Sequence, residues 1–195
     1  MTFAGIATLF GYMAVCSFTP GPGNILALNT TTQYGWKSSR RLIFGICIGY
    51  GVVQAICTIA LCQLNNVLSP ALQVLKYIGG IYMVWLAIHM MRSRPQTEGN
   101  EKQPTFREGF LLQFVNVKIY FYIMTLLSVC FIPHLHSAAG LTAAGTVAVL
   151  IGSAASLVWA FLGMKLQTTY EKHYRIINII LGLFLIYCAW NIIRG

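Results

Sequence analysis

Thr19-Pro20-Gly21-Pro22-Gly23-Asn24 interrupts an uncharged stretch that runs from Met1 to Trp36. Each proline lacks an N–H donor and clashes with the carbonyl one turn back, and glycine adds backbone freedom. A regular α-helix therefore cannot continue through this segment. Because apolar sequence lies on both sides, we expect the break to lie at membrane depth. Irregular backbone at that depth is tolerated only where protein buries it or where it lines a polar cavity.

Composition and run length predict an all-α membrane protein. Charged residues make up 9% of the chain and hydrophobic residues 57%, whereas an average soluble domain is about 25% charged. A bilayer core of ~30 Å requires about 20 apolar residues per helix. The sequence contains six such runs: Phe3–Gln33 (broken), Leu42–Leu64, Leu72–Met91, Gly109–Ile132, Ala138–Met164 and Ile176–Ile193. They use nearly the whole chain, so we predict one transmembrane domain, residues 1–195, of six helices.

The first run is predicted to be a retained span. It has no basic residues ahead of it and is too long for the apolar region of a cleaved signal peptide.

Basic residues predict the orientation of these helices. They gather in the connections after the first, third and fifth runs: Lys37, Arg40, Arg41; Arg92, Arg94, Lys102, Arg107; Lys165, Lys172, Arg175. The connections after the second and fourth runs contain neither lysine nor arginine. Since positive residues mark cytoplasmic loops, both termini are predicted to be periplasmic. The same distribution explains the net charge of +9 without a nucleic-acid partner.

A second polar interruption, Gln113-Phe114-Val115-Asn116-Val117-Lys118, suggests an internal repeat. Asn116 lies 92 positions after Asn24, and each asparagine falls in the first span of a three-span half. Because three is odd, the second half would insert the opposite way up. We predict an inverted 3+3 repeat with a broken first helix in each half: residues 1–91 and 109–195, joined by a cytoplasmic linker at 92–108.

Lys118 is the second informative residue, because it lies well inside the fourth run. A lysine at mid-membrane costs on the order of 2.5–3.5 kcal/mol on insertion scales, and such residues usually face a bundle interior or a wet cavity. Snorkelling by ~5 Å does not reach the interface from this depth. Lys76 and His89 lie near the ends of the third run, where snorkelling is sufficient, and we assign them no function.

The two interruptions together predict a binding site for a small zwitterion. The predicted substrate-binding residues are Pro20, Gly21, Pro22, Gly23, Asn24, Gln113, Asn116 and Lys118. Helix ends at a break offer N–H groups to a carboxylate and carbonyls to an ammonium. The side-chain amides donate and accept, and lysine adds a cation. Residue chemistry alone does not identify which polar solute binds.

Proton coupling, if present, cannot use a carboxylate at the midplane. The chain contains no Asp, and Glu98, Glu101, Glu108 and Glu171 all fall in breaks between apolar runs. Lys118 is therefore the coupling candidate, which either binds the substrate carboxylate or exchanges protons as substrate leaves.

The sequence predicts no cofactor and no metal. All six cysteines lie in apolar runs without a C-x-x-C pair, and we interpret them as small buried hydrophobes. His134 and His136 share a short outer connection, where solvated histidines are the simpler interpretation. The sequence leaves oligomeric state open, and a homo-oligomer is compatible with it.

The quoted motifs resemble those of the LysE/RhtB family of bacterial amino-acid exporters, over essentially the whole chain. The family usually has proline between the asparagine and the lysine of its second motif, where this chain has Val117. TPGPGNILAL, GGIYMVWLA at 79–87 and LQFVNVK are similar to the subgroup that exports cysteine and O-acetylserine. The resemblance implies secondary active efflux of small amino acids across the bacterial inner membrane.

Other functions remain open at this stage. Homoserine or threonine are alternative substrates within the same family. A membrane enzyme requires a nucleophile–base pair or a metal cluster, and the spans contain only the peripheral His89. A passive channel or scaffold would explain Gly45, Gly49, Gly51, Gly79 and Gly80 through close helix packing. It would not explain the break at Pro20–Gly23 or Lys118.

Overall fold

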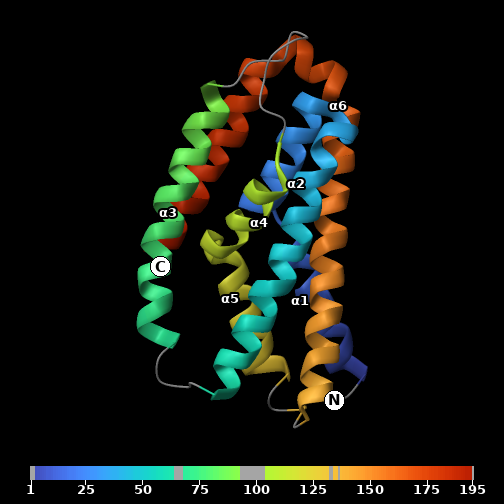
Figure 1. Cartoon of the computed structure of the whole chain (residues 1–195), viewed down its shortest axis with the longest axis vertical. Helices are drawn as coiled ribbons and strands as arrows, with labels where there is room; N and C mark the ends of the chain where they lie inside the picture. Colours follow the sequence, from blue (N-terminus) through green and yellow to red (C-terminus); the bar gives the residue numbers. More distant parts are fainter. Residues whose placement is uncertain (1–2, 64–67, 93–103, 132–133, 136, 195) are drawn as a thin grey trace.

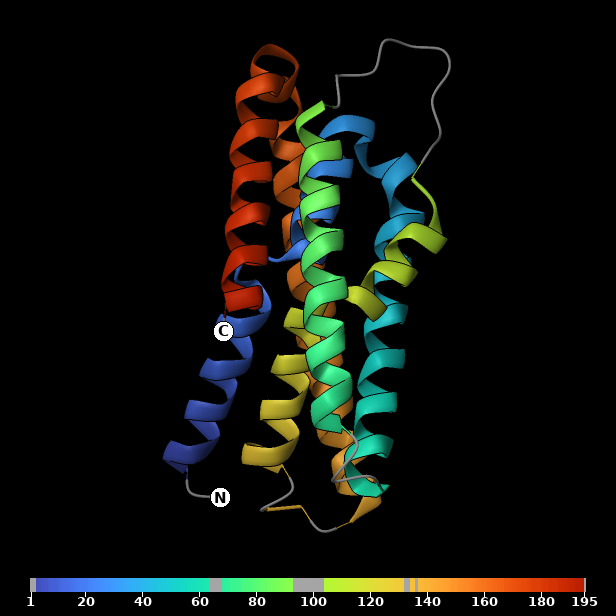
Figure 2. The same cartoon turned by 90° about the vertical axis from the view of Figure 1, so that its left-hand side faces the viewer.

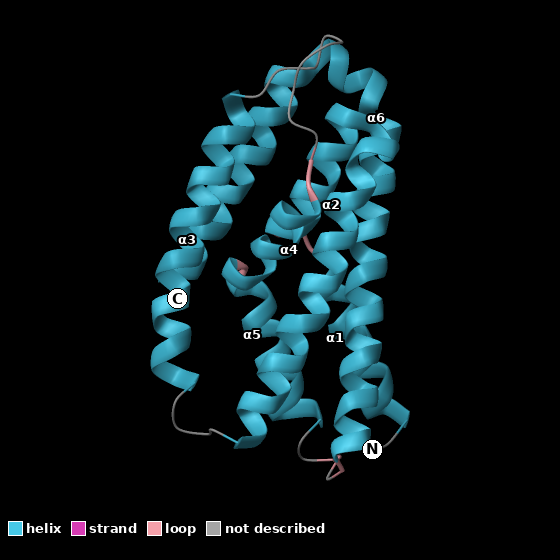
Figure 3. Cartoon of the chain, viewed as in Figure 1, coloured by secondary structure: helices cyan, strands magenta, loops and turns pink. Residues whose placement is uncertain are grey.

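The computed structural model describes residues 3–63, 68–92, 104–131, 134–135 and 137–194, and these residues form helices joined by short loops, without a strand (Figures 1 and 3). The elements are α1 (Phe3–Phe18), α2 (Pro22–Gln63), α3 (Leu68–Arg92), α4 (Phe106–Val115), α5 (Val117–Thr125), the π-helix η1 (Leu126–Phe131) and α6 (Ala138–Arg194). The prediction of an all-α protein is confirmed.

The helices are suited to a bilayer. Among the described residues, three stretches are long and apolar enough to cross a membrane: Pro22–Ala60, Ala138–Tyr170 and Lys172–Trp190. Large apolar side chains also cover the outside of the bundle, with Ile81 69% exposed and Leu150 63% exposed. A soluble surface does not carry apolar residues at this density, whereas acyl chains solvate them. The chain is therefore a multi-pass membrane protein.

Two of the expected loops are helix instead. Lys37, Arg40 and Arg41 belong to α2, which bends at Gly35, the one described residue with positive φ (69°). Lys165 and the other basic residues of the fifth connection belong to α6, which is non-helical only at His173 (φ −127°, ψ 23°). The prediction of loops at these two connections was wrong. A single non-helical residue turns each helix, so no longer loop is required. Both helices rise to the same end of the molecule and then return (Figures 1 and 2).

Glycines bring α4 against α2. A Cβ on Gly109 would overlap the carbonyl of Leu42, and a Cβ on Gly45 would overlap the carbonyl of Phe106. The two backbones therefore touch, as small residues permit in membrane helix pairs. One turn further along, a Cβ on Gly49 would lie 2.9 Å from Cγ of Gln113. This contact holds Gln113 in the bundle interior.

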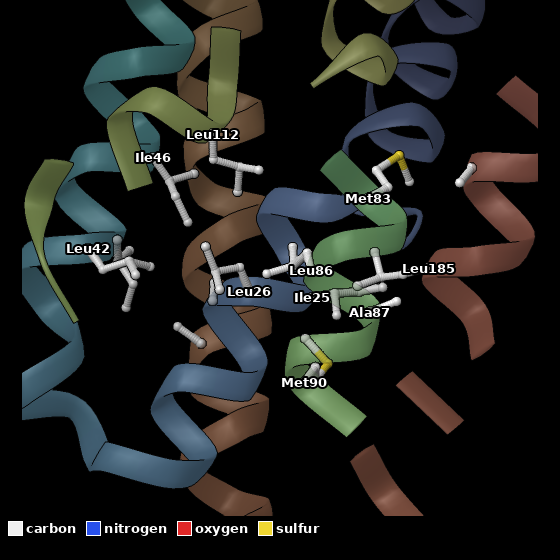
Figure 4. Close-up of a cluster of buried hydrophobic side chains, with 14 residues drawn as sticks. Ile25, Leu26, Leu42, Ile46, Met83, Leu86, Ala87, Met90, Leu112 and Leu185 are labelled. Carbon is white, nitrogen blue, oxygen red and sulfur yellow. The ribbon is translucent and has the colours of Figure 1, made fainter. Parts of the chain in front are cut away.

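Buried apolar side chains form two clusters. The first joins α2, α3, α4 and α6 and is shown in Figure 4: Ile25, Leu26, Ala27, Leu42, Ile43, Ile46, Met83, Leu86, Ala87, Met90, Leu112, Ala160, Leu185, Ala189. The second joins α1, α2, α5, η1 and α6: Met13, Tyr50, Val53, Cys57, Tyr122, Ile123, Leu126, Leu127, Phe131, Leu141, Ala148. Ile46 and Tyr50, one turn apart on α2, belong to different clusters. The polar residues described next lie between them.

Candidate functional site

The first helix break is short, and hydrogen bonds within the same segment mark both of its ends. The Thr19 hydroxyl donates to the carbonyls of Val15 (2.8 Å) and Cys16 (2.9 Å), which ends α1. The amide of Ile25 donates to the Gly21 carbonyl at 2.9 Å, which begins α2. Pro22 is the first residue of α2, where its missing N–H and fixed φ are tolerated. The chain therefore leaves the helix only over Thr19–Gly21.

Asn24 ties the two sides of this break together. Its Nδ2 donates to the carbonyls of Ser17 (2.8 Å) and Thr19 (3.1 Å), both at the end of α1. Its Oδ1 accepts from Ser156 Oγ of α6 at 3.1 Å. All three bonds are made by a side chain that is only 8% exposed. Asn24 is thus a structural link between α1, α2 and α6 at the edge of the cavity described below.

Side chains from distant elements also donate to the carbonyls at and just after the end of α1. Lys118 Nζ donates to the Thr19 carbonyl at 2.6 Å, and Trp159 Nε1 donates to the Phe18 carbonyl at 3.0 Å. The sequence suggested carbonyls free to accept a substrate ammonium. In this structure the protein's own donors occupy them.

The second break lies at Asn116, between α4 and α5. Its backbone (φ −82°, ψ 85°) is outside the helical region, and its amide donates to the Gln113 carbonyl at 3.4 Å. The amide of Ile119 then donates to the Asn116 carbonyl at 3.0 Å, which begins the next helix. Val117 is the first residue of α5, the position that proline favours.

The amides of Gln113 and Asn116 form a buried pair with two unsatisfied atoms. Asn116 Nδ2 donates to Gln113 Oε1 at 3.2 Å. Gln113 is fully buried and Asn116 is 3% exposed. Gln113 Nε2 and Asn116 Oδ1 have no hydrogen-bond partner among the described residues. A buried polar atom left unpaired costs about 1–3 kcal/mol, so these two atoms indicate a place for water or a polar ligand.

Both breaks open on one small cavity of about 50 Å³. Its lining comprises Cys16, Ser17, Gly21, Gly23, Asn24, Ile46, Tyr50, Gln113, Asn116, Lys118, Ile119, Tyr122, Gly152 and Ser156. A more apolar cavity of about 370 Å³ adjoins it, lined by Tyr12, Cys16, Thr19, Pro20, Gly21, Pro22, Met83, Lys118, Phe121, Tyr122, Thr125 and Cys188. Lys118 belongs to both linings and lies between the two spaces.

The structure brings together all eight residues that the sequence suggested as a site. Each lines at least one of the two cavities. The glycines let side chains approach their backbone closely: a Cβ on Gly21 would be 2.7 Å from Lys118 Cδ, and one on Gly23 would be 3.2 Å from Gln113 Nε2. Their role toward a substrate remains a prediction.

Sequence reasoning missed several lining residues. Ser156 and Tyr122 complete the polar wall, and Ser17 Oγ lies 3.5 Å from the Tyr122 hydroxyl. Ser156 sits in a run of small residues that gives no signal beyond helix packing. Cys16 lines both cavities, although its surroundings in the sequence predicted an ordinary apolar contact.

His89, to which we assigned no function, lies away from both cavities. His89 stacks on Trp85 with ring centroids 5.6 Å apart, and it lines neither cavity. Glu108 caps α4 by accepting from the Thr105 amide at 3.0 Å. Within the described ranges no cluster of His, Cys, Asp and Glu could hold a metal ion. The side chain of Lys76, His136 and most of the 92–108 linker lie outside the described residues.

Comparisons with known proteins identify the family to which this sequence belongs. The model of the LysE type translocator family matches residues 14–195. The cysteine/O-acetylserine efflux proteins of Escherichia coli strain K12 and Shigella sonnei strain Ss046 are each 33% identical over 193 residues, covering 98% of this chain and 99% of the relative. No solved structure matches the chain. The resemblance carried by TPGPGN and QFVNVK is confirmed. The chain belongs to the LysE-type translocator family and is a membrane transporter rather than an enzyme.

Proposed function

We propose that this chain exports small amino acids and their derivatives across the bacterial inner membrane, with cysteine and O-acetylserine as its substrates. The names of the relatives, which align over nearly their whole length, support this substrate class. One structural observation carries the proposal: a lysine ammonium and two unsatisfied amide atoms meet where two helix breaks touch. Homoserine and threonine are the alternative substrates.

The groups at the junction match the two ends of an amino acid. A substrate carboxylate would accept from Lys118 Nζ, from Gln113 Nε2 and from the first-turn N–H of Gly23, which has no acceptor within its helix. A substrate ammonium would donate to Asn116 Oδ1 and to the Thr19 carbonyl that Lys118 releases. Both charges of the zwitterion are then paired, as burial requires.

Binding requires the site to open. A cavity of about 50 Å³ has room for a few water molecules, at ~10–15 Å³ each on this measure, and not for a whole amino acid. Moving Lys118 away from the Thr19 carbonyl would join the small cavity to its larger apolar neighbour. The polar end of the substrate would then lie at the breaks, and its side chain would lie between Met83 and Cys188. We infer that Lys118 closes the passage between the two cavities in this structure.

Proton coupling would use the same contact between Lys118 and the Thr19 carbonyl. The part of the chain that the structure describes contributes no Asp or Glu to either cavity, so the proposal does not use a carboxylate relay. We assign Lys118 as the coupling group of a secondary active, proton-linked exporter. It either exchanges the Thr19 carbonyl for a substrate carboxylate or loses its proton as substrate departs.

A transport panel tests the substrate class. Proteoliposomes containing the purified chain and loaded with unlabelled amino acid are expected to accumulate labelled cysteine and O-acetylserine by saturable counterflow. Labelled lysine should not accumulate, because its second cation has no partner among the lining residues. Non-saturable flux in this assay would indicate a channel, and absence of flux a scaffold. Saturable flux of homoserine or threonine alone would select the alternative substrates.

We further propose six transmembrane spans in an inverted 3+3 repeat, with halves at residues 1–91 and 109–195. The bends at Gly35 and His173 divide α2 and α6 into two spans each. The broken pair α1–α2 rises from the N-terminal end in Figure 1, whereas the broken pair α4–α5 descends beside it. Opposite directions and touching breaks are what two inverted halves require.

Orientation can be tested with fusions to the C-terminus. The bends and their basic residues lie at the end of the molecule opposite the N-terminus (Figure 2). If that end is cytoplasmic, alkaline phosphatase fused after Gly195 should be active, because it folds only in the periplasm. A fluorescent C-terminal green fluorescent protein fusion with an inactive phosphatase fusion would place the C-terminus inside and contradict the proposed orientation.

A further inference from the structure

We propose that an anionic phospholipid binds on the outer face of α2 near its bend, with its headgroup held by Arg40, Arg41 and Arg107. Two adjoining cavities form this lipid groove. One of about 570 Å³ is lined by Arg41, Pro104, Thr105, Phe106 and Arg107. The other, of about 490 Å³, is lined by Trp36, Arg40, Arg41, Ile43, Phe44, Cys47, Phe106 and Leu157. They share Arg41 and Phe106, so they form one continuous surface feature.

The charged end of the lipid groove is formed by three arginines. Arg40, Arg41 and Arg107 are all exposed, and no carboxylate is found among the described residues that line the two cavities. Glu108, the acidic residue next to Arg107, is engaged in the cap of α4 with Thr105. Guanidinium groups bind phosphate oxygens in a bidentate manner. Three of them from two helices therefore form a receptor for a phosphate group.

The other end of the lipid groove is apolar and would extend along α2 toward the interior of the bilayer. Phe44 is 62% exposed and lies 6.1 Å from the ring of Phe106 on α4, while Leu157 of α6 forms the opposite wall. From Arg40 to Cys47 the helix extends for about 10 Å, enough for the upper part of an acyl chain. Trp36 lies at the mouth, where indoles favour the headgroup region.

Charge and shape together select one occupant. A soluble phosphate would leave the apolar walls uncovered, and a zwitterionic lipid would bring its own cation toward three arginines. A phospholipid with a net negative headgroup satisfies both parts of the groove. Each arginine near an anionic headgroup contributes about five-fold in affinity.

Quenching of Trp36 fluorescence by brominated acyl chains tests this proposal. The purified chain is placed in phosphatidylcholine vesicles containing a minor fraction of brominated phosphatidylglycerol or of brominated phosphatidylcholine. The Trp36→Phe variant supplies the signal of the other tryptophans for subtraction. We expect phosphatidylglycerol to quench Trp36 at a lipid fraction at least about five-fold lower. Substituting all three arginines with glutamine should abolish the preference, and substituting them with lysine should preserve it.

A matched variant controls for net charge. Lys165→Gln, Lys172→Gln and Arg175→Gln together remove the same charge from α6 without touching the lipid groove, and the preference should remain. Equal quenching by the two lipids overturns the proposal. So does an equal loss in the control variant, or displacement of the brominated lipid by soluble glycerol 3-phosphate, which would identify a site for a free phosphate.

Discussion

Replacing Lys118 with glutamine is expected to lower the affinity for exported amino acid by about 10- to 100-fold, the worth of a hydrogen bond to a charged group. In the structure this ammonium donates to the Thr19 carbonyl at 2.6 Å and separates the two cavities. Glutamine cannot supply the charge that the substrate carboxylate needs. The measurement is the concentration dependence of counterflow in proteoliposomes.

The same variant tests coupling. If Lys118 exchanges a proton during transport, the residual flux of Lys118→Gln should no longer respond to an imposed pH gradient. Lys165→Gln is the matched control, because Lys165 lies 5.4 Å from the Phe161 ring and lines neither cavity. Unchanged export with an unchanged response to the gradient would show that Lys118 neither binds substrate nor couples transport.

Replacing Asn24 with leucine is expected to abolish transport and to reduce the yield of folded protein. The Ser17 carbonyl would lose its side-chain donor, and Ser156 would lose its acceptor. Each unpaired buried group costs about 1–3 kcal/mol, so the junction of α1, α2 and α6 should loosen. Counterflow and thermal stability in detergent, measured on the same preparation, report the two effects.

Asn29→Leu is the control for that substitution. Asn29 is 7% exposed, lies on the same helix and accepts a hydrogen bond from Gln33 Nε2 at 3.0 Å. It lines neither cavity. If Asn29→Leu reduced transport and stability as much as Asn24→Leu, the defect would reflect loss of any buried amide from α2 rather than loss of the helix junction.

Local chemistry explains which breaks were predictable. The first break follows from covalent properties of Pro20, Gly21 and Pro22, which act on their own neighbours and can be read from the sequence. The second break has no proline or glycine, because Val117 occupies the first position of α5. Its position was inferred from polar residues and from its distance to Asn24, and the backbone of Asn116 departs from the helix there.

Tertiary contacts explain what the sequence did not reveal. Lys118 and Thr19 are 99 positions apart, and Ser156 and Asn24 are 132 positions apart. No local pattern encodes such pairs. The sequence therefore did not predict that side chains of other helices donate hydrogen bonds to the carbonyls at the end of α1. The bend at Gly35 falls in the predicted connection after Gln33, but the sequence did not reveal that helix continues on both sides of that single residue.

Protection of Cys16 from alkylation tests the central claim, that an amino acid binds at the junction of the two breaks. Cys16 lines both cavities beside Lys118. In a variant that retains Cys16 as its only cysteine, saturating O-acetylserine, which has no thiol of its own, should slow the reaction of Cys16 with N-ethylmaleimide. Adding Lys118→Gln should remove this protection. An alkylation rate that O-acetylserine leaves unchanged, in a variant that still transports it, would place the binding site elsewhere.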